Sequence, residues 1–260
     1  MRFSLVASTL ATCAWAAPPF PRINVLDTIP NNIRAISDYF NLLATKVQES
    51  KKLAAPPACD LSQVSLPEYA RSSLPPPSPG LVLKHIAIGR GTQNYTCDPG
   101  AEKPRQTGAV ATLFNASCTV ATSPELASLL GHAALQFPLH QSLETQRLAP
   151  SNLAVSGVHF FTKDGAPWFD LDVSPLWKMG GIVGAKNTSA QAPETAAKGL
   201  GGEPAVPWLK LVAKESTGGL QEVYRIETVG GSAPQTCSGM PIGREFQVEY
   251  ATQYWFYAKP

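Results

Sequence analysis

Two aspartates in a segment of alternating polar and apolar residues come closest to a catalytic pair in this sequence. Asp170 and Asp172 are separated by one residue in WFDLDV, so on a β-strand their carboxylates share one face, about 7 Å apart. Two carboxylates can act as the general acid and the nucleophile or base of a glycoside hydrolase. The alternation is more typical of a solvated outer face, and an extracellular polymer hydrolase that uses these carboxylates is therefore the alternative hypothesis.

Neither the histidines nor the cysteines form a metal-binding motif. The four histidines are dispersed, no C-x-x-C is present, and no G-x-S-x-G marks a nucleophile elbow. His85 and His159 each lie inside an apolar segment, which is more typical of a hydrogen-bonded core histidine than of a ligand. We expect neither a metal nor a cofactor.

A glycine-rich stretch has to be compared with the dinucleotide-binding fingerprint. Gly89 and Gly91 lie in GRGTQN, which lacks the third glycine and leads into another strand-like segment instead of a helix. The alternation of strands and helices that builds a dinucleotide fold is absent as well. The two glycines are predicted to be turn or bulge residues.

Aromatic residues suggest a binding function. In the closing segment, the apolar members of one face are predicted to point into the core: Phe246, Val248, Tyr250, Tyr254 and Phe256. Trp255 and Tyr257 occupy the opposite, otherwise polar face, and with Trp168 they are the candidates for an exposed surface that stacks on sugars. Buried core aromatics are the competing interpretation.

The first residues indicate export. Residues 1–16 carry one basic residue, an apolar run and small residues at Ala14-Trp15-Ala16, a pattern typical of a cleaved signal peptide. Its removal leaves an even number of cysteines, as expected of disulfides in an oxidising compartment. We predict the pairs Cys97–Cys118 and Cys59–Cys237. The predicted location is extracellular or in the cell wall.

Three sequons are consistent with that location. Asn94, Asn115 and Asn187 each begin an Asn-x-Ser/Thr triplet and are predicted glycosylation sites. We expect two of the three to carry a glycan, because the proximity of Asn94 and Asn115 to cysteines favours burial of one of them.

Composition excludes several classes of protein. The chain has 260 residues, of which 44% are apolar and 15% charged, with a formal net charge of +2. Such a chain has enough apolar residues for a core and too few charges for general disorder. The scattered lysines and arginines argue against nucleic-acid binding, and no later apolar run reaches the roughly 20 residues of a membrane span.

The remaining patterns predict the organisation of the chain. After the signal peptide, residues 17–58 comprise a proline-punctuated lead, a helix over 31–53 and the start of a proline-rich connector that extends over 54–80. Residues 59–260 are predicted to form a single all-β domain, an antiparallel sandwich or barrel of about eight strands with one short helix at 124–131. The predicted strands are 81–88, 92–97, 109–117, 153–161, 168–173, 206–213, 221–228 and 246–257.

Seven segments, in order, resemble a known family. They are GRGTQNYTC (89–97), FNASC (114–118), GVHFF (157–161), GAPWFDL (165–171), PWLKL (207–211), VYRIETVGGSAPQTCSG (223–239) and YATQYWFY (250–257). Together they resemble a secreted fungal family that is defined only as a domain of unknown function. Its members are often labelled malate dehydrogenase, but the missing dinucleotide fingerprint argues against that activity here. The resemblance implies export and supplies no catalytic residue.

The function predicted from the sequence is therefore that of a secreted, non-enzymatic glycoprotein that binds a cell-wall glycan or an extracellular protein. A polymer hydrolase is the alternative, and a dehydrogenase is the least supported of the three.

Overall fold

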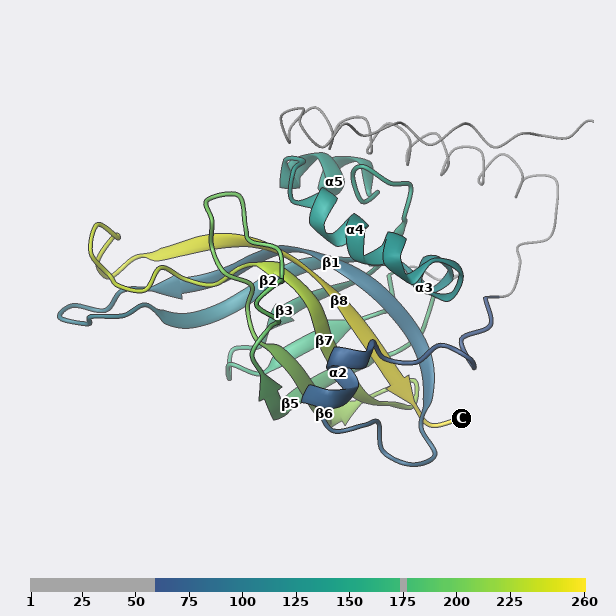
Figure 1. Ribbon diagram of the computed structural model, residues 1–260. Coiled ribbons are helices and arrows are strands. Elements are labelled where there is room, and N and C mark those ends of the chain that lie inside the picture. Colours follow the sequence, from purple (N-terminus) through teal and green to yellow (C-terminus); the bar gives the residue numbers. More distant parts are fainter. Residues whose placement is uncertain (1–58, 174–176) are drawn as a thin grey trace, which may run out of the picture.

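The structure is a computed structural model that describes residues 59–173 and 177–260 (Figure 1). The predicted signal peptide and the predicted helix over 31–53 lie outside the described residues. No helix within the described ranges is both long and apolar enough to span a membrane.

Eight antiparallel strands close into a barrel in which each strand pairs with its neighbours in sequence and the last strand pairs with the first. The strands are β1 (Val82–Thr96), β2 (Arg105–Asn115), β3 (Val155–Phe161), β4 (Pro167–Asp170), β5 (Gly181–Ala190), β6 (Trp208–Ser216), β7 (Leu220–Gly230) and β8 (Glu245–Ala258). The closed sheet confirms the predicted all-β fold and shows that, of the two predicted architectures, the barrel is the one formed.

Within the described ranges, four short helices pack outside the barrel (Figure 1). They are α2 (Glu68–Ser73), α3 (Ser117–Thr122), α4 (Pro124–Ala134) and α5 (Leu139–Thr145). The predicted helix at 124–131 corresponds to α4, and Pro124 is its first residue as expected. Gly131 does not end it, because the helix continues for another three residues to Ala134.

The glycine-rich stretch does not form a turn. Gly89 and Gly91 lie inside β1, which is one continuous strand where two were predicted. A Cβ on Gly89 would lie 2.6 Å from the ring of Tyr254, so the glycine leaves the space that this aromatic side chain fills. The predicted turn or bulge is therefore wrong, and close packing inside the barrel is the reason for a glycine here. The segment that became β5 was not predicted as a strand.

Apolar side chains form two large clusters, one on each side of the sheet. The inner cluster fills the barrel and comprises Ala87, Leu113, Phe169, Leu171, Ile182, Leu211, Leu220, Val223, Tyr254, Phe256 and Ala258. The outer cluster lies between the sheet and helices α2, α3 and α4, and includes Ile86, Ile88, Phe114, Trp208, Tyr224, Ile226, Trp255 and Tyr257. Strand β8 contributes to both clusters.

Because β8 contributes to both clusters, the predicted exposure of Trp255 and Tyr257 is wrong. Their exposed fractions are only 1% and 6%. The indole Nε1 of Trp255 donates a hydrogen bond of 3.0 Å to the side-chain oxygen of Gln253, which is itself buried. The polar outer face expected from the alternation exists only near the start of β8, where Gln247 is exposed and the helices do not reach.

A buried ion pair fixes the proline-rich connector to the barrel. Lys210 on β6 and Glu222 on β7 lie 3.1 Å apart, and both side chains are almost fully buried. The ammonium group of Lys210 also donates to the carbonyl of Pro76 at 2.7 Å, and the hydroxyl of Ser78 donates to Glu222 at 2.6 Å. These bonds satisfy two charges that would otherwise be costly to bury.

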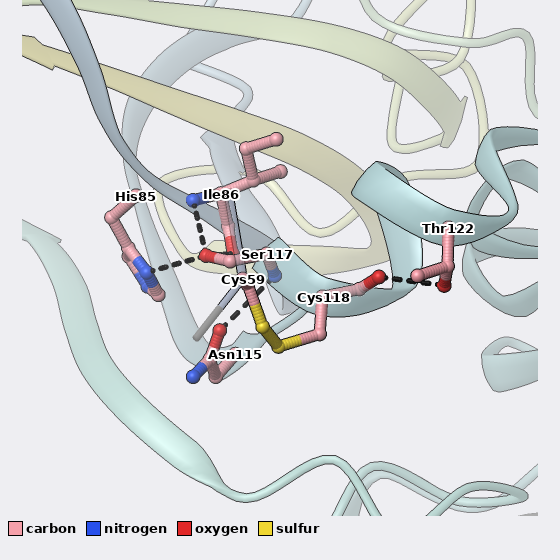
Figure 2. Close-up of a disulfide and its surroundings, with 7 residues drawn as sticks. All are labelled: Cys59, His85, Ile86, Asn115, Ser117, Cys118 and Thr122. Carbon is pink, nitrogen blue, oxygen red and sulfur yellow. Dashed lines mark hydrogen bonds between the residues drawn. A yellow bond between two sulfur atoms is a disulfide. The ribbon is translucent and has the colours of Figure 1, made fainter. Parts of the chain in front are cut away.

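The predicted disulfide partners have to be corrected, although all four cysteines within the described residues are paired. The bonds are Cys59–Cys118 and Cys97–Cys237, with Cα–Cα distances of 5.2 and 5.8 Å. Cys97 follows the end of β1 and Cys118 follows the end of β2, so roughly 35 Å of extended strand separates them. Figure 2 shows the Cys59–Cys118 disulfide at the start of α3. This bond joins α3 to the beginning of the described residues.

The strand directions define two different ends of the barrel. The end that carries the β1–β2, β3–β4, β5–β6 and β7–β8 connections is called the mouth end here. The opposite end, where β1 begins and β8 finishes, is packed by Phe256, Leu220 and Leu171 of the inner cluster, and is called the packed end.

We predict that Trp255→Ala and Phe256→Ala destabilise the fold to a similar extent, by about 3–5 kcal/mol each, because both side chains are fully buried on opposite faces of β8. Urea unfolding of the two variants measures this. Val110→Ala is the control, since Val110 is 53% exposed and should cost less than about 1 kcal/mol. A small loss for Trp255→Ala with a large loss for Phe256→Ala would contradict the two-sided burial.

Candidate functional site

A cavity of about 530 Å³ opens at the mouth end of the barrel. Its described lining comes from six strands and two connections, and consists of Gln106, Phe161, Asp164, Gly165, Ala166, Pro167, Gly184, Ala185, Lys186, Ser189, Pro207, Leu209, Leu211, Lys214 and Arg225. The volume falls within the range of small-molecule sites.

The wall of the cavity is apolar and its rim is charged. Phe161, Leu209 and Leu211 supply apolar wall, and none of the three is exposed. Lys186 and Lys214 are exposed at the rim. Asp164 is the only carboxylate among the described lining residues, so positive charge predominates.

Arg225 is the buried charge of the site. It lies on β7, opposite Leu209 on one side and Tyr254 on the other, with 9% of its surface exposed. One terminal nitrogen donates to the carbonyl of Pro207 at 2.8 Å, whereas Nε has no hydrogen-bond partner.

Two tyrosines lie near Arg225 inside the barrel. The hydroxyls of Tyr250 and Tyr254 are 2.9 Å apart and hydrogen-bonded. Burial raises the pKa of Tyr254, while the charge of Arg225 and its hydrogen bond to the phenol oppose that rise. Burial also raises the pKa of Tyr250. Both phenols are therefore neutral hydrogen-bonding groups, which do not supply a negative charge for the guanidinium.

His159 is a core histidine, as predicted. Its Nδ1 donates to the carbonyl of Trp168 at 2.8 Å, and its ring stacks on Phe169 with a centroid distance of 4.1 Å. Burial lowers its pKa to about 4. The imidazole is therefore neutral near pH 7.

His85 is also a core histidine, near the packed end of the barrel, where its ring stacks on Phe256 with a centroid distance of 5.8 Å. Its two ring nitrogens are hydrogen-bonded to Ser156 at 2.9 Å and to Ser117 at 3.1 Å (Figure 2 shows the second bond). Ser117 accepts a further bond from the backbone N–H of Ile86, so it belongs to a structural network next to the first disulfide. Burial lowers the pKa of His85 to about 4.

The two aspartates of the hydrolase hypothesis are not brought together across a cavity. Asp170 ends β4, and its carboxylate accepts a bond from the backbone N–H of Asp172 at 2.9 Å. Asp172 lies beyond the strand and accepts a bond from the backbone N–H of Gly180 at 2.7 Å. Both carboxylates therefore cap backbone groups of a connection, and neither lines the barrel cavity.

Trp168, the third aromatic candidate, is half-buried. On β4 it pairs with Phe160 of β3, and Phe160 pairs with Val110 of β2. Phe160 and Val110 are exposed on a side of the sheet away from the outer cluster. Trp168 thus belongs to an apolar row on the outer face and not to the cavity.

Two other cavities, of about 290 and 480 Å³, lie outside the barrel, and both are lined by Ser128 and Glu227. The hydroxyl of Ser128 donates to the carboxylate of Glu227 at 2.7 Å. No charged side chain in the described lining of either cavity is fully buried. The barrel cavity is therefore the stronger candidate.

Sequence reasoning missed Arg225, although a signal was present. In LQEVYRIETVG the residues that face the interior alternate with those of the outer cluster, and Arg225 takes an inward position after Val223. An arginine at an apolar position of a strand marks either a buried ion pair or a ligand site.

Fold and cavity together define a closed antiparallel barrel with a small-molecule-sized cavity at one end. Residues 77–258 match the model of a protein family of unknown function, DUF3455, and the chain belongs to that family. Residues 8–75 match a second family of unknown function, DUF2990, so the two matches meet in the proline-rich connector. Neither a curated protein nor a solved structure matches the chain.

We predict that the fold loses stability between pH 6.5 and pH 4. The folded-state pKa of His85 and of His159 is about 4, against an ordinary value of 6.5, so the unfolded chain binds more protons in this interval. The contribution of each histidine to the free energy of unfolding is fully present above pH 6.5 and decreases as the pH falls. At pH 4.5 the loss is about 2–3 kcal/mol for each histidine. Urea unfolding at pH 7 and pH 4.5 measures the change.

The variant His159→Asn separates this effect from general acid unfolding. It should be less stable at pH 7 but should lose about half of the dependence on pH. An unchanged dependence in this variant would show that the buried imidazole is not responsible.

Proposed function

We propose that this protein is a secreted, non-enzymatic binding protein that takes a small ligand into the mouth of its barrel. The observation that carries the proposal is the cavity of about 530 Å³, which combines an apolar wall with one buried charge. Eight-stranded barrels are wide enough to hold one small ligand inside, and small-molecule sites combine apolar walls with few polar groups in this way.

Because the candidate aromatic side chains are buried, we propose the cavity as the binding site in place of the surface. A sugar-stacking platform needs exposed rings, but Trp255 and Tyr257 are buried beneath helices and connector. The cavity wall offers Phe161 and aliphatic side chains instead, which suit an apolar ligand better than a glycan.

The chemistry inside the barrel supports binding in preference to catalysis. The hydrolase hypothesis needs two carboxylates across a cleft, whereas Asp170 and Asp172 hold backbone N–H groups elsewhere. The two imidazoles on the inner side of the sheet are held by hydrogen bonds, His159 to the backbone carbonyl of Trp168 and His85 to Ser156 and Ser117.

We predict that a neutral apolar dye, N-phenyl-1-naphthylamine, binds in the cavity with an increase in fluorescence, and that Leu209→Trp abolishes this signal. Leu209 lines the cavity, and the larger indole would occupy the space of the ligand. Dye titration of the purified protein, with one site per chain as the expected stoichiometry, is the measurement.

Leu200→Trp is the matched control, because Leu200 is 60% exposed and does not line the cavity. It should leave dye binding unchanged. If the natural protein gave no saturable signal, or if both variants bound the dye equally well, the proposed site would be refuted.

We also propose export with glycans on two of the three sequons. The side-chain nitrogen of Asn94, the atom that would carry a glycan, donates to Glu245 at 3.0 Å, and Asn94 is buried. Asn187 is exposed on β5, and Asn115 is half-buried. The exposure of these side chains favours Asn115 and Asn187 as acceptors.

Expression in a eukaryotic secretory host tests this assignment. Asn115→Gln and Asn187→Gln should each lower the mass of the secreted protein by one glycan, whereas Asn94→Gln should not. Intact mass before and after glycosidase treatment distinguishes the three variants, and a lower mass for Asn94→Gln would contradict the assignment.

A further inference from the structure

Two arginines are buried within this sheet, and only one of them is fully partnered. Arg90 on β1 forms an ion pair with Glu249 and donates to the carbonyls of Ala134, Gly91 and Phe137 at 3.2–3.3 Å. Every nitrogen of this guanidinium therefore has an acceptor. Arg90 shows what a buried arginine with a purely structural role looks like in this protein.

Arg225 lacks that set of partners. Its only carbonyl acceptor is that of Pro207, its Nε has none, and no carboxylate of the described residues forms an ion pair with it. Its other polar neighbours are the phenols of Tyr254, Tyr250 and Tyr95 and the imidazole of His159, and none of these groups carries a negative charge. A guanidinium that is nine-tenths buried without a counter-charge is costly, because desolvation of the ion is not offset.

The missing partner has to be an anion that reaches the cavity. A guanidinium presents its N–H groups as a planar fork that matches a carboxylate, and burial strengthens such a charge-assisted pair. The space next to Arg225 is walled by Phe161, Leu209 and Leu211, which favours an apolar body attached to the anionic group. A single buried arginine matches a single negative charge, whereas the rim lysines are exposed.

We propose that the ligand is a carboxylate with an apolar body, and that its carboxylate group pairs with Arg225 inside the barrel. This inference rests on the proposed function and specifies its ligand class. Arg225 gives the binding its selectivity for the anion, and the apolar wall binds the remainder of the molecule. The exposed Lys186 and Lys214 add a positive field at the entrance, which attracts anions to the mouth.

The first test compares decanoate with 1-decanol as competitors of N-phenyl-1-naphthylamine. Decanoate should bind the natural protein at least tenfold more tightly than the alcohol of the same chain length, and Arg225→Met should reduce this ratio to about twofold or less. Leu209→Trp should abolish binding of both. Decyl phosphate is the third competitor, and tighter binding of the phosphate than of decanoate would overturn the assignment to carboxylates.

The second test needs no ligand. Because the charge of Arg225 is unpaired, Arg225→Met should leave the Tm of the ligand-free protein unchanged or raise it. Arg90→Met removes a guanidinium that is fully hydrogen-bonded and should lower the Tm by several degrees. If Arg225→Met lowered the Tm as much as Arg90→Met, Arg225 would be a structural residue and the proposal would be wrong.

The outcomes separate this inference from the proposed function. Dye binding that is sensitive to Leu209→Trp, combined with equal affinity for decanoate and decanol, would retain the binding function and refute the carboxylate. Absence of saturable dye binding by the natural protein would refute the proposed function and, with it, this inference.

Discussion

Pairing of the first strand with the last is the constraint on which the rest of this structure depends. β1 and β8 pair along nearly their whole length, from Val82 opposite Ala258 to Thr96 opposite Glu245. This pairing closes the sheet, leaves no unpaired edge and separates an inside from an outside. The inside has to be filled or to form a cavity, and the structure does both, with large apolar side chains at the packed end and open space at the mouth end.

Closure also explains why the outside is uneven. Helices α2 to α4 and the connector cover the outer face of β1, β7 and β8, whereas Val110, Val158 and Phe160 on β2 and β3 remain exposed. On the covered side, polar groups hold the proline-rich connector against the sheet. The Lys210–Glu222 ion pair and Ser78 are these groups. The strands with the longest pairing are thus also the ones enclosed on both faces.

The sequence predicted the parts of this fold that follow from local alternation. The period of two identified most strands, the all-β class and the core position of both histidines. It failed for β5, because the sequence GIVGAKNTSA consists mainly of small and polar residues with little alternation. It also divided β1 at Gly89 and Gly91, of which Gly89 admits the ring of Tyr254 and Gly91 admits the backbone of β2 at Val110 and Ala111. Both failures have the same cause, because the conformation of each segment is determined by neighbouring strands and side chains that are distant in sequence.

The site was less predictable than the fold for the same reason. Whether an outward tryptophan such as Trp255 is exposed depends on which helix covers it, and the cysteine partners depend on which barrel end each cysteine reaches. Arg225 stands out only once the interior is known, because its significance lies in the counter-charge that its surroundings lack.

The direction of the last strand determines how this protein can be attached to a surface or to another protein. β8 runs from the mouth end to the packed end, so a linker joined after Pro260 leaves the barrel on the side opposite to the cavity (Figure 1). A protein immobilised through such a linker would present its entrance to the solution. An insertion in the connections 191–207 or 231–244 would instead lie beside the entrance and obstruct it.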